Sequence, residues 1–237
     1  MLGGTAEARA LAAELTERGV PVVSSLAGRV ATPRLPAGEV RLGGFGGPDG
    51  LAAWLTEAKI GALVDATHPF AAKMTASAVE AAERTGTPLL TLRRPGWREG
   101  PEDDWRRVPS LEAAAALLAA PMRVFLTTGR RSLPVFTGLP GVWLLARSVD
   151  PPESPVPDHV HVLLARGPYT VEGELALIRE HRLDMLVTKD SGGTMTTPKL
   201  DAARRSGLPV IMVDRPPPPP GLRQVDTVRA AADWAQG

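Results

Sequence analysis

The sequence predicts an α/β protein made of two similar parallel-sheet domains, and three observations carry this prediction. Short apolar segments of the strand type alternate with helical segments, as in parallel sheets whose strands are joined by helices. The chain has 237 residues, 43% hydrophobic and 22% charged, enough for one large domain or two small ones. Residues 81–95 also match residues 202–216 without a gap, so the two halves repeat one another.

The repeat continues on both sides of this block. Upstream, Leu63-Val64 before an Asp65 loop align with Leu186-Val187 before a Lys189 loop. Downstream, residues 108–115 match residues 225–232. Because the three blocks keep their order, we expect one domain over residues 1–120, a second over residues 121–237, and a cleft between them.

The elements of the first half begin with a glycine turn. Gly3-Gly4-Thr5 precede a helical pattern that Gly19 ends, and residues 20–23 then read as a strand. Only Met1 and Leu2 precede the glycines, where a first strand supplies about five residues; either the start is assigned too late or this strand is stunted. Strands are predicted at residues 60–64 and 89–92, and helices at residues 72–85 and 110–119.

The second half repeats this alternation. Strands are predicted at residues 122–127, 142–146, 160–164, 183–187 and 210–213, with a helix at residues 198–205. Five consecutive prolines, residues 216–220, form a stiff extended connector. Asp226 or Thr227 caps the last helix.

The composition excludes several classes of function. The net charge is +1, which gives no general case for nucleic acid or membrane binding. Cysteine is absent, which removes disulfides and thiolate chemistry. No apolar run approaches ~20 residues and the start is not a signal peptide, so a cytoplasmic protein is expected. Arginine outnumbers lysine 23 to 4, which indicates either a GC-rich genome or an arginine-lined site for carboxylates or phosphates.

The loops of the first half favour a dinucleotide. Ligands of parallel sheets bind beyond the carboxyl ends of the strands. Gly3-Gly4-Thr5 before a helix suit a phosphate, although an ordinary tight turn reads the same way. Ser24-Ser25 and Arg29 stand where NAD-binding proteins place a carboxylate for the ribose, so NADPH is favoured over NADH. Gly43-Gly44-Phe45-Gly46-Gly47 either lies against a cofactor or is a flexible turn.

Two further loops have catalytic or anion-binding side chains. His68 is either a structural histidine or a group that donates a proton or binds a carboxylate. Lys189 precedes Ser191, Gly192 and Gly193, whose backbone amides suit an anion nest. Other arginines fall at strand ends, namely Arg94, Arg130, Arg166 and Arg215. The remaining histidines show no ligand spacing with His68, so no metal site is expected.

Taken together, the loop motifs resemble those of one enzyme family over residues 3 to about 216. They are Gly-Gly-Thr-x-Glu-Ala (3–8), Ser-Leu-Ala-Gly-Arg (25–29), Gly-Gly-Phe-Gly-Gly (43–47), Asp-Ala-Thr-His-Pro-Phe (65–70), Arg-Pro-x-Trp (94–97), Thr-Gly-Arg (128–130), Arg-Gly-Pro (166–168) and Lys-x-Ser-Gly-Gly (189–193). The ordered set strongly resembles the precorrin-6A reductases of cobalamin biosynthesis. That resemblance implies two Rossmann-like domains, and transfer of a hydride from NADPH to the C18–C19 double bond of precorrin-6A, giving precorrin-6B.

The resemblance also implies roles for individual residues. On the nucleotide side we expect Gly3, Gly4, Thr5, Glu7, Ser24, Ser25, Arg29, Gly43, Gly44, Phe45, Gly46 and Thr67. Asp65, His68 and Lys189 are the expected catalytic residues, with His68, Lys189 or water as the proton donor. Substrate carboxylates are assigned to Arg94, Arg130, Arg166, Ser191, Gly192 and Gly193. Tyr169 stands where a phenylalanine is expected.

Three alternatives stay open at this stage. The substrate is either metal-free or the cobalt-bearing macrocycle of the anaerobic pathway. An S-adenosylmethionine-dependent methyltransferase also has a glycine-loop α/β fold, but it needs an acid after the second strand that this chain lacks. A non-catalytic NADP-sensing module needs only one nucleotide site, whereas charged loops occur in both halves. The sequence is compatible with a monomer or a homodimer.

Overall fold

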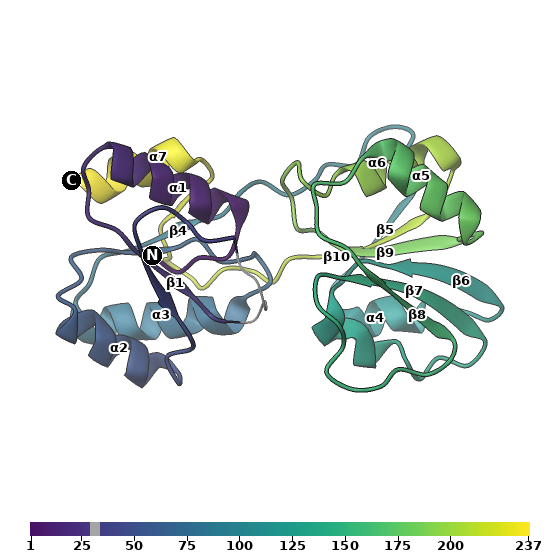
Figure 1. Cartoon of the computed structure of the whole chain (residues 1–237), viewed down its shortest axis with the longest axis horizontal. Helices are drawn as coiled ribbons and strands as arrows, with labels where there is room; N and C mark the ends of the chain where they lie inside the picture. The colour runs from purple at the N-terminus through teal and green to yellow at the C-terminus, as the bar shows by residue number, and fades with distance from the viewer. Residues whose placement is uncertain (29–33) are drawn as a thin grey trace. The chain divides into compact units, whose positions relative to one another are not determined.

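The computed structural model describes residues 1–28 and 34–237, and these form two compact units (Figure 1). Unit 1 contains residues 1–95 together with 216–237, and unit 2 contains residues 96–215. The chain therefore passes from one unit to the other twice, after Pro95 and after Arg215. This division differs from the single boundary near residue 120 that the repeat indicates.

Unit 1 contains a parallel sheet whose central position is occupied by the first residues of the chain. Leu2 forms parallel bridges to both Ser25 and Asp65, and its amide donates to the carbonyl of Val64 (2.8 Å). The other strands are β1 (Val23–Leu26), β2 (Glu39–Leu42), β3 (Leu63–Asp65), β4 (Leu89–Leu92) and β11 (Gln224–Val225). The spatial order is β2-β1-(1–3)-β3-β4-β11. With residues 1–3 as the first strand this is the order 3-2-1-4-5-6 of the Rossmann fold.

Four helices cover the two faces of this sheet. They are α1 (Ala6–Glu17), α2 (Pro48–Glu57), α3 (Ala72–Thr85) and α7 (Val228–Gln236). Leu11 and Leu15 of α1 pack in one buried cluster with Ala231 and Ala232 of α7. Figure 1 shows the yellow α7 beside the purple α1. On the other face, α2 and α3 form a second buried cluster, which contains Leu51.

Unit 2 contains a second parallel sheet with the same strand order. Its strands are β5 (Trp105–Val108), β6 (Met122–Leu126), β7 (Val142–Ser148), β8 (Val160–Leu164), β9 (Met185–Lys189) and β10 (Val210–Val213), in the order β5-β10-β9-β6-β7-β8. Its helices are α4 (Leu111–Ala116), α5 (Val171–Glu180) and α6 (Pro198–Ser206), and a 3₁₀ turn η1 (Arg130–Val135) follows β6. Read from β6 as the first strand, the order is again 3-2-1-4-5-6.

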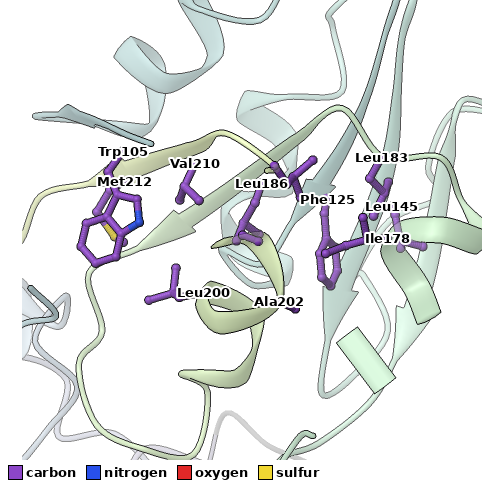
Figure 2. Close-up of a cluster of buried hydrophobic side chains, with 12 residues drawn as sticks. Trp105, Phe125, Leu145, Ile178, Leu183, Leu186, Leu200, Ala202, Val210 and Met212 are labelled. Atoms are coloured by element: carbon purple, nitrogen blue, oxygen red, sulfur yellow. The ribbon is translucent and has the colours of Figure 1, made fainter. Parts of the chain in front are cut away.

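The last strand and helix of each repeat are exchanged between the units. β5 and α4 follow β4 in sequence, but β5 pairs with β10 of unit 2; β11 follows β10 but pairs with β4 of unit 1. Figure 2 shows Trp105 of β5 in the core of unit 2, together with Met212, Leu186 and Phe125. The repeat therefore identifies equivalent elements correctly, and the exchange explains why residues 96–120 belong with the second half.

The second strand lies three residues later than predicted. The start of the predicted strand instead completes the end of α1, because the amide of Gly19 donates to the carbonyl of Thr16 and the amide of Val20 donates to the carbonyl of Leu15. Pro21 has no amide hydrogen to pair, and β1 begins at Val23. Ser24 and Ser25 consequently lie inside this strand instead of following it. In the described ranges, no helix combines the length and hydropathy needed to cross a membrane.

Candidate functional site

The first strand-to-helix turn of unit 1 is open where a ligand would approach. Gly3 donates its amide to Ser25 O (2.9 Å), and a Cβ added to it would lie 3.3 Å from Leu26, so this glycine allows close packing. Gly4 has φ +115° and would present a Cβ to empty space. Thr5 caps α1, accepting from the amide of Ala8 (3.0 Å) and donating to Ala66 O (2.8 Å). The hydroxyl of Thr5 is thus structural, and Gly4 is the position at which the backbone is exposed.

Ser24 borders a small pocket beside this turn. The pocket is lined by Gly3, Gly4, Ser24 and Leu26, with the arginines Arg9 and Arg34, among others. The Oγ atom of Ser24 is buried and has no hydrogen-bond partner among the residues that the structure describes. Ser25 is also buried within β1. Arg29, expected to bind the 2′-phosphate, lies outside the described residues.

The glycine cluster after β2 packs against its own unit. The guanidinium of Arg41 donates to the carbonyls of Gly43 (2.8 Å) and Gly44 (3.1 Å) and lies 3.9 Å from the ring centroid of Phe45. Phe45 also contacts Trp54 of α2, with ring centroids 5.4 Å apart. The aromatic ring assigned to the cofactor is therefore part of the α2 packing, whereas Gly44 and Gly46 are exposed.

Asp65 organises the loop after β3. Its Oδ1 accepts from the amide (3.0 Å) and hydroxyl (2.7 Å) of Thr67, and its Oδ2 accepts from the hydroxyl of Thr75 (2.6 Å). The carboxylate is buried. Nδ1 of His68 accepts from the amide of Phe70 (3.2 Å), so the neutral ring has its proton on Nε2. In this geometry Asp65 and Thr67 shape the loop, and His68 remains a group able to donate a proton.

Arg94 and Glu7, expected on the substrate and cofactor sides, form one ion pair. Nη1 of Arg94, just after β4, lies 2.5 Å from Oε2 of Glu7 in the first turn of α1. Both side chains are largely buried, at 14% and 23% exposure. Both residues belong to unit 1, whereas the other arginines assigned to the substrate belong to unit 2.

Lys189 ends β9 in unit 2 and is held by the loop after β6. Its Nζ donates to Thr128 O (2.9 Å) and to the hydroxyl of Ser132 (2.7 Å). Burial lowers the pKa of the Lys189 ammonium, and the nearby charge of Arg131 lowers it further. The contact joins β9 to β6, the two strands between which the strand order reverses. A lysine with a lowered pKa at this position suits proton transfer.

The glycine loop that follows is fixed by Asp190 and Trp97. Asp190, whose carboxylate is buried, accepts from the amide of Trp97 (2.9 Å) and from Arg107 (3.1 Å). The indole Nε1 of Trp97 donates to Gly193 O (3.0 Å). Gly192 and Gly193 have φ of +63° and +76°, values that glycine adopts without strain; Gly192 is buried and Gly193 is half-buried.

The other predicted arginines of unit 2 differ in their surroundings. Arg130 begins η1, where it donates to Pro151 O (3.1 Å) and lies 3.7 Å from Glu153. Arg166 is exposed in the connection between β8 and α5. The structure thus places Arg130, Arg166, Lys189 and residues 191–193 together in unit 2, with the nucleotide set in unit 1. No group of three or more metal-ligating side chains occurs in the part of the chain that the structure describes.

A buried charge cluster in unit 2 escaped the sequence reasoning. Arg147 of β7 and Glu174 of α5 form an ion pair (2.5 Å) whose side chains are 5% and 2% exposed. The ring of Tyr169 covers Arg147 at 3.7 Å, and Lys199 of α6 is buried beside them. The scarcity of lysine was the one sequence signal that could have drawn attention to Lys199. Its position in the predicted helix, however, is that of an ordinary surface residue.

Comparison with known proteins agrees with this geometry. Residues 1–236 match the family model described as precorrin-6x reductase CbiJ/CobK. A precorrin-6A reductase of Rhodococcus erythropolis is 54% identical over 99% of this chain and 95% of its own length. A cobalt-precorrin-6A reductase of Priestia megaterium is 31% identical over 91% of this chain and 89% of its own length.

The fold comparison agrees as well. A solved structure of CobK precorrin-6A reductase superposes with a TM-score of 0.94 at 43% identity, covering 99% of this chain and 94% of that one. Two Rossmann-ordered units, the loop motifs and full-length matches point the same way. The chain belongs to the precorrin-6x reductase family, a family of oxidoreductases in cobalamin biosynthesis.

Proposed function

We propose that this enzyme reduces the C18–C19 double bond of metal-free precorrin-6A with NADPH, giving precorrin-6B. The observation that carries the proposal is the first turn of unit 1, where the strand order reverses and Gly4 is exposed at a left-handed φ. In a Rossmann sheet the pyrophosphate of a dinucleotide binds at this point, against the N-terminus of the first helix. Full-length relatives named precorrin-6A reductase support the substrate.

The residues around this turn fit a dinucleotide phosphate. Ser24 offers a buried hydroxyl without a partner among the described residues, and the same pocket is lined by Arg9 and Arg34. Together with Arg29 these groups favour a 2′-phosphate, because Ala27 and Gly28 follow β1 where an NAD site has a carboxylate. NADPH bound here supplies the hydride, and the chain supplies binding and orientation.

The second product hydrogen requires a proton, for which the chain offers two side chains. His68, with its Nε2 proton, follows β3 in unit 1, and Lys189 ends β9 in unit 2. Water is the third donor. Around the macrocycle, Arg130, Arg166 and residues 191–193 are the groups that we assign to the acetate and propionate groups.

The metal-free substrate is favoured over its cobalt-bearing counterpart by degree of similarity. Five relatives named precorrin-6A reductase are 45–54% identical to this chain, whereas three named cobalt-precorrin-6A reductase are 31–34% identical. The family assignment also favours a reductase over the methyltransferase and the NADP-sensing module.

The decisive experiment mixes the purified protein with metal-free precorrin-6A and NADPH. We expect coupled loss of 340 nm absorbance and a shift of the tetrapyrrole spectrum, with much slower turnover of the cobalt macrocycle. Arg29→Gln and Arg34→Gln are expected to weaken NADPH by about 10- to 100-fold each, the effect of a charge-assisted hydrogen bond, and NADH much less. Inertness toward both macrocycles would contradict the assignment, and equal losses for both cofactors would remove the 2′-phosphate contact.

A further inference from the structure

Lys199 contacts the loop that follows β9 and also Trp97, which itself binds this loop. Its Nζ donates to Thr196 O (2.9 Å). The same atom lies 4.5 Å from the ring centroid of Trp97, which is within cation–π range. The indole Nε1 of Trp97 in turn contacts Gly193 O (3.0 Å) and the hydroxyl of Thr197 (3.2 Å). Trp97 therefore contacts both ends of residues 193–197, and Lys199 contacts Thr196 between them.

The charged surroundings of Lys199 come from two other elements. Arg147 of β7 and Glu174 of α5 act on it with opposite sign, and Tyr169 covers the guanidinium of Arg147. Oε2 of Glu174 is buried and has no hydrogen-bond partner within the described ranges. Burial and, to a smaller extent, the charge of Arg147 lower the pKa of Lys199 to about 7, while the charge of Glu174 acts in the opposite direction. The lysine therefore loses its charge within the range of pH in which enzymes are assayed.

An apolar residue at position 199 could be buried at a lower cost in free energy than lysine. Burying an ammonium costs free energy unless hydrogen bonds compensate it, whereas a methionine of similar length would fill the space without that cost. The lysine offers two things that methionine lacks. These are a donor for the carbonyl of Thr196 and a positive charge against the indole of Trp97.

We propose that Lys199 is a positioning residue for substrate, whose ammonium holds residues 191–197 in the shape that presents the amide of the half-buried Gly193 to a substrate carboxylate. The inference rests on the proposed function, because it takes this loop as part of the macrocycle site. The carbonyl of Gly193 accepts from Trp97 and the carbonyl of Thr196 accepts from Lys199, so the orientation of the Gly193 amide depends on these two contacts. When Lys199 loses its proton, its hydrogen bond to Thr196 O and its cation–π contact with Trp97 both weaken, and the affinity for substrate falls.

The test compares Lys199→Met with Lys73→Met, a matched change at an exposed lysine of α3. The chain has only four lysines, so their ¹³Cε signals can be followed separately by NMR from pH 6 to 9. We expect one signal to titrate near pH 7 and to be missing in Lys199→Met. Amide hydrogen exchange of residues 191–197 should be faster in this variant than in the wild type. In the wild type it should also accelerate from pH 6 to 9 by more than the intrinsic pH dependence of exchange.

The kinetic arm separates positioning from general damage. We expect the wild-type KM for precorrin-6A to rise about 10-fold from pH 6 to 9, the scale of one hydrogen bond. In Lys199→Met the KM should be raised at pH 6 and flat with pH, with kcat and NADPH affinity nearly unchanged. A merely structural role would raise the KM by one factor at every pH.

Other outcomes overturn the inference in distinguishable ways. Unchanged exchange in Lys199→Met would show that the lysine does not hold the loop. Faster exchange with unchanged KM would show that the loop does not bind substrate, while the reductase assignment stands. If no macrocycle is reduced at all, the proposed function fails and the exchange data still decide the role in the loop. Should Lys199→Met not fold, Trp97→Phe removes the indole contacts and must loosen the same residues.

Discussion

Replacing Asp65 by asparagine tests whether this buried carboxylate builds the loop after β3 or takes part in the reaction. Three donors converge on it, the amide and hydroxyl of Thr67 and the hydroxyl of Thr75, at 3.0, 2.7 and 2.6 Å. Asparagine keeps the volume but turns three charge-assisted bonds into neutral ones, and forces the Thr75 hydroxyl to accept. At about 1 kcal/mol for each weakened bond, the loss is roughly 2–3 kcal/mol.

The assay for Asp65→Asn is thermal unfolding alongside steady-state kinetics. A loss of this size lowers the melting temperature by about 10 °C in a domain of roughly 100 residues. Thr75→Val leaves the carboxylate in place and removes one donor, so it should reproduce about a third to a half of the shift. Both variants should retain kcat within a few-fold at temperatures where they are folded.

A chemical role for Asp65 gives the opposite pattern. If the carboxylate transferred a proton, Asp65→Asn would lose about 100-fold or more in kcat, while Thr75→Val would stay active. That result with an unchanged melting temperature in the asparagine variant would refute the loop-building interpretation. It would return Asp65 to the catalytic set expected from the sequence.

Three other changes probe the remaining parts of the site. Gly4→Ala places a methyl group in the open turn and strains a left-handed backbone by about 1–2 kcal/mol, so calorimetry should show NADPH binding at least 10-fold weaker with macrocycle binding intact. Glu174→Gln leaves Arg147 buried without its counter-charge, which should cost about 3–5 kcal/mol in thermal unfolding, and NMR should show a still lower pKa for Lys199. Because the pKa of Lys189 is lowered in the fold, the wild type should gain stability relative to Lys189→Met as pH rises toward 10.5, measured by urea unfolding at pH 7 and 9.5; equal differences at both values would contradict this.

The sequence predicted the architecture well because its signals are local. Apolar strands followed by polar loops identify a parallel sheet, and the repeat correctly identifies β4 and β10 as equivalent strands of the two units. The strand with which β5 pairs could not be predicted from local sequence, because the four residues of β5 suit the edge of either sheet. Only the packing of Trp105 in the core of unit 2 shows which sheet contains β5. The placement of β1 failed because apolar residues 20–23 read as a strand, although residues 19 and 20 complete the end of α1.

The candidate site was predicted less completely, for a different reason. Residue type shows what a side chain offers and not what it already binds. Thr5 caps a helix, Phe45 packs on Trp54, and Asp65 accepts from Thr67 in its own loop and from Thr75 of α3. Glycine conformation was more informative, because the exposed left-handed turn at Gly4 has no packing role. The buried Lys199 could not be found from its position in sequence.

The exchanged strands set the order in which a nascent chain can mature. Unit 2 has all its strands once Val213 has left the ribosome, but β4 has no outer neighbour until Gln224 appears. The stretch from Leu92 to Gln224 takes on the order of 10 seconds to make at ~5–20 residues per second. During that time the unpaired edge of β4 is available to β5, which is the next strand in the chain and the equivalent of β11 in the repeat; any such pairing has to break before unit 1 is complete.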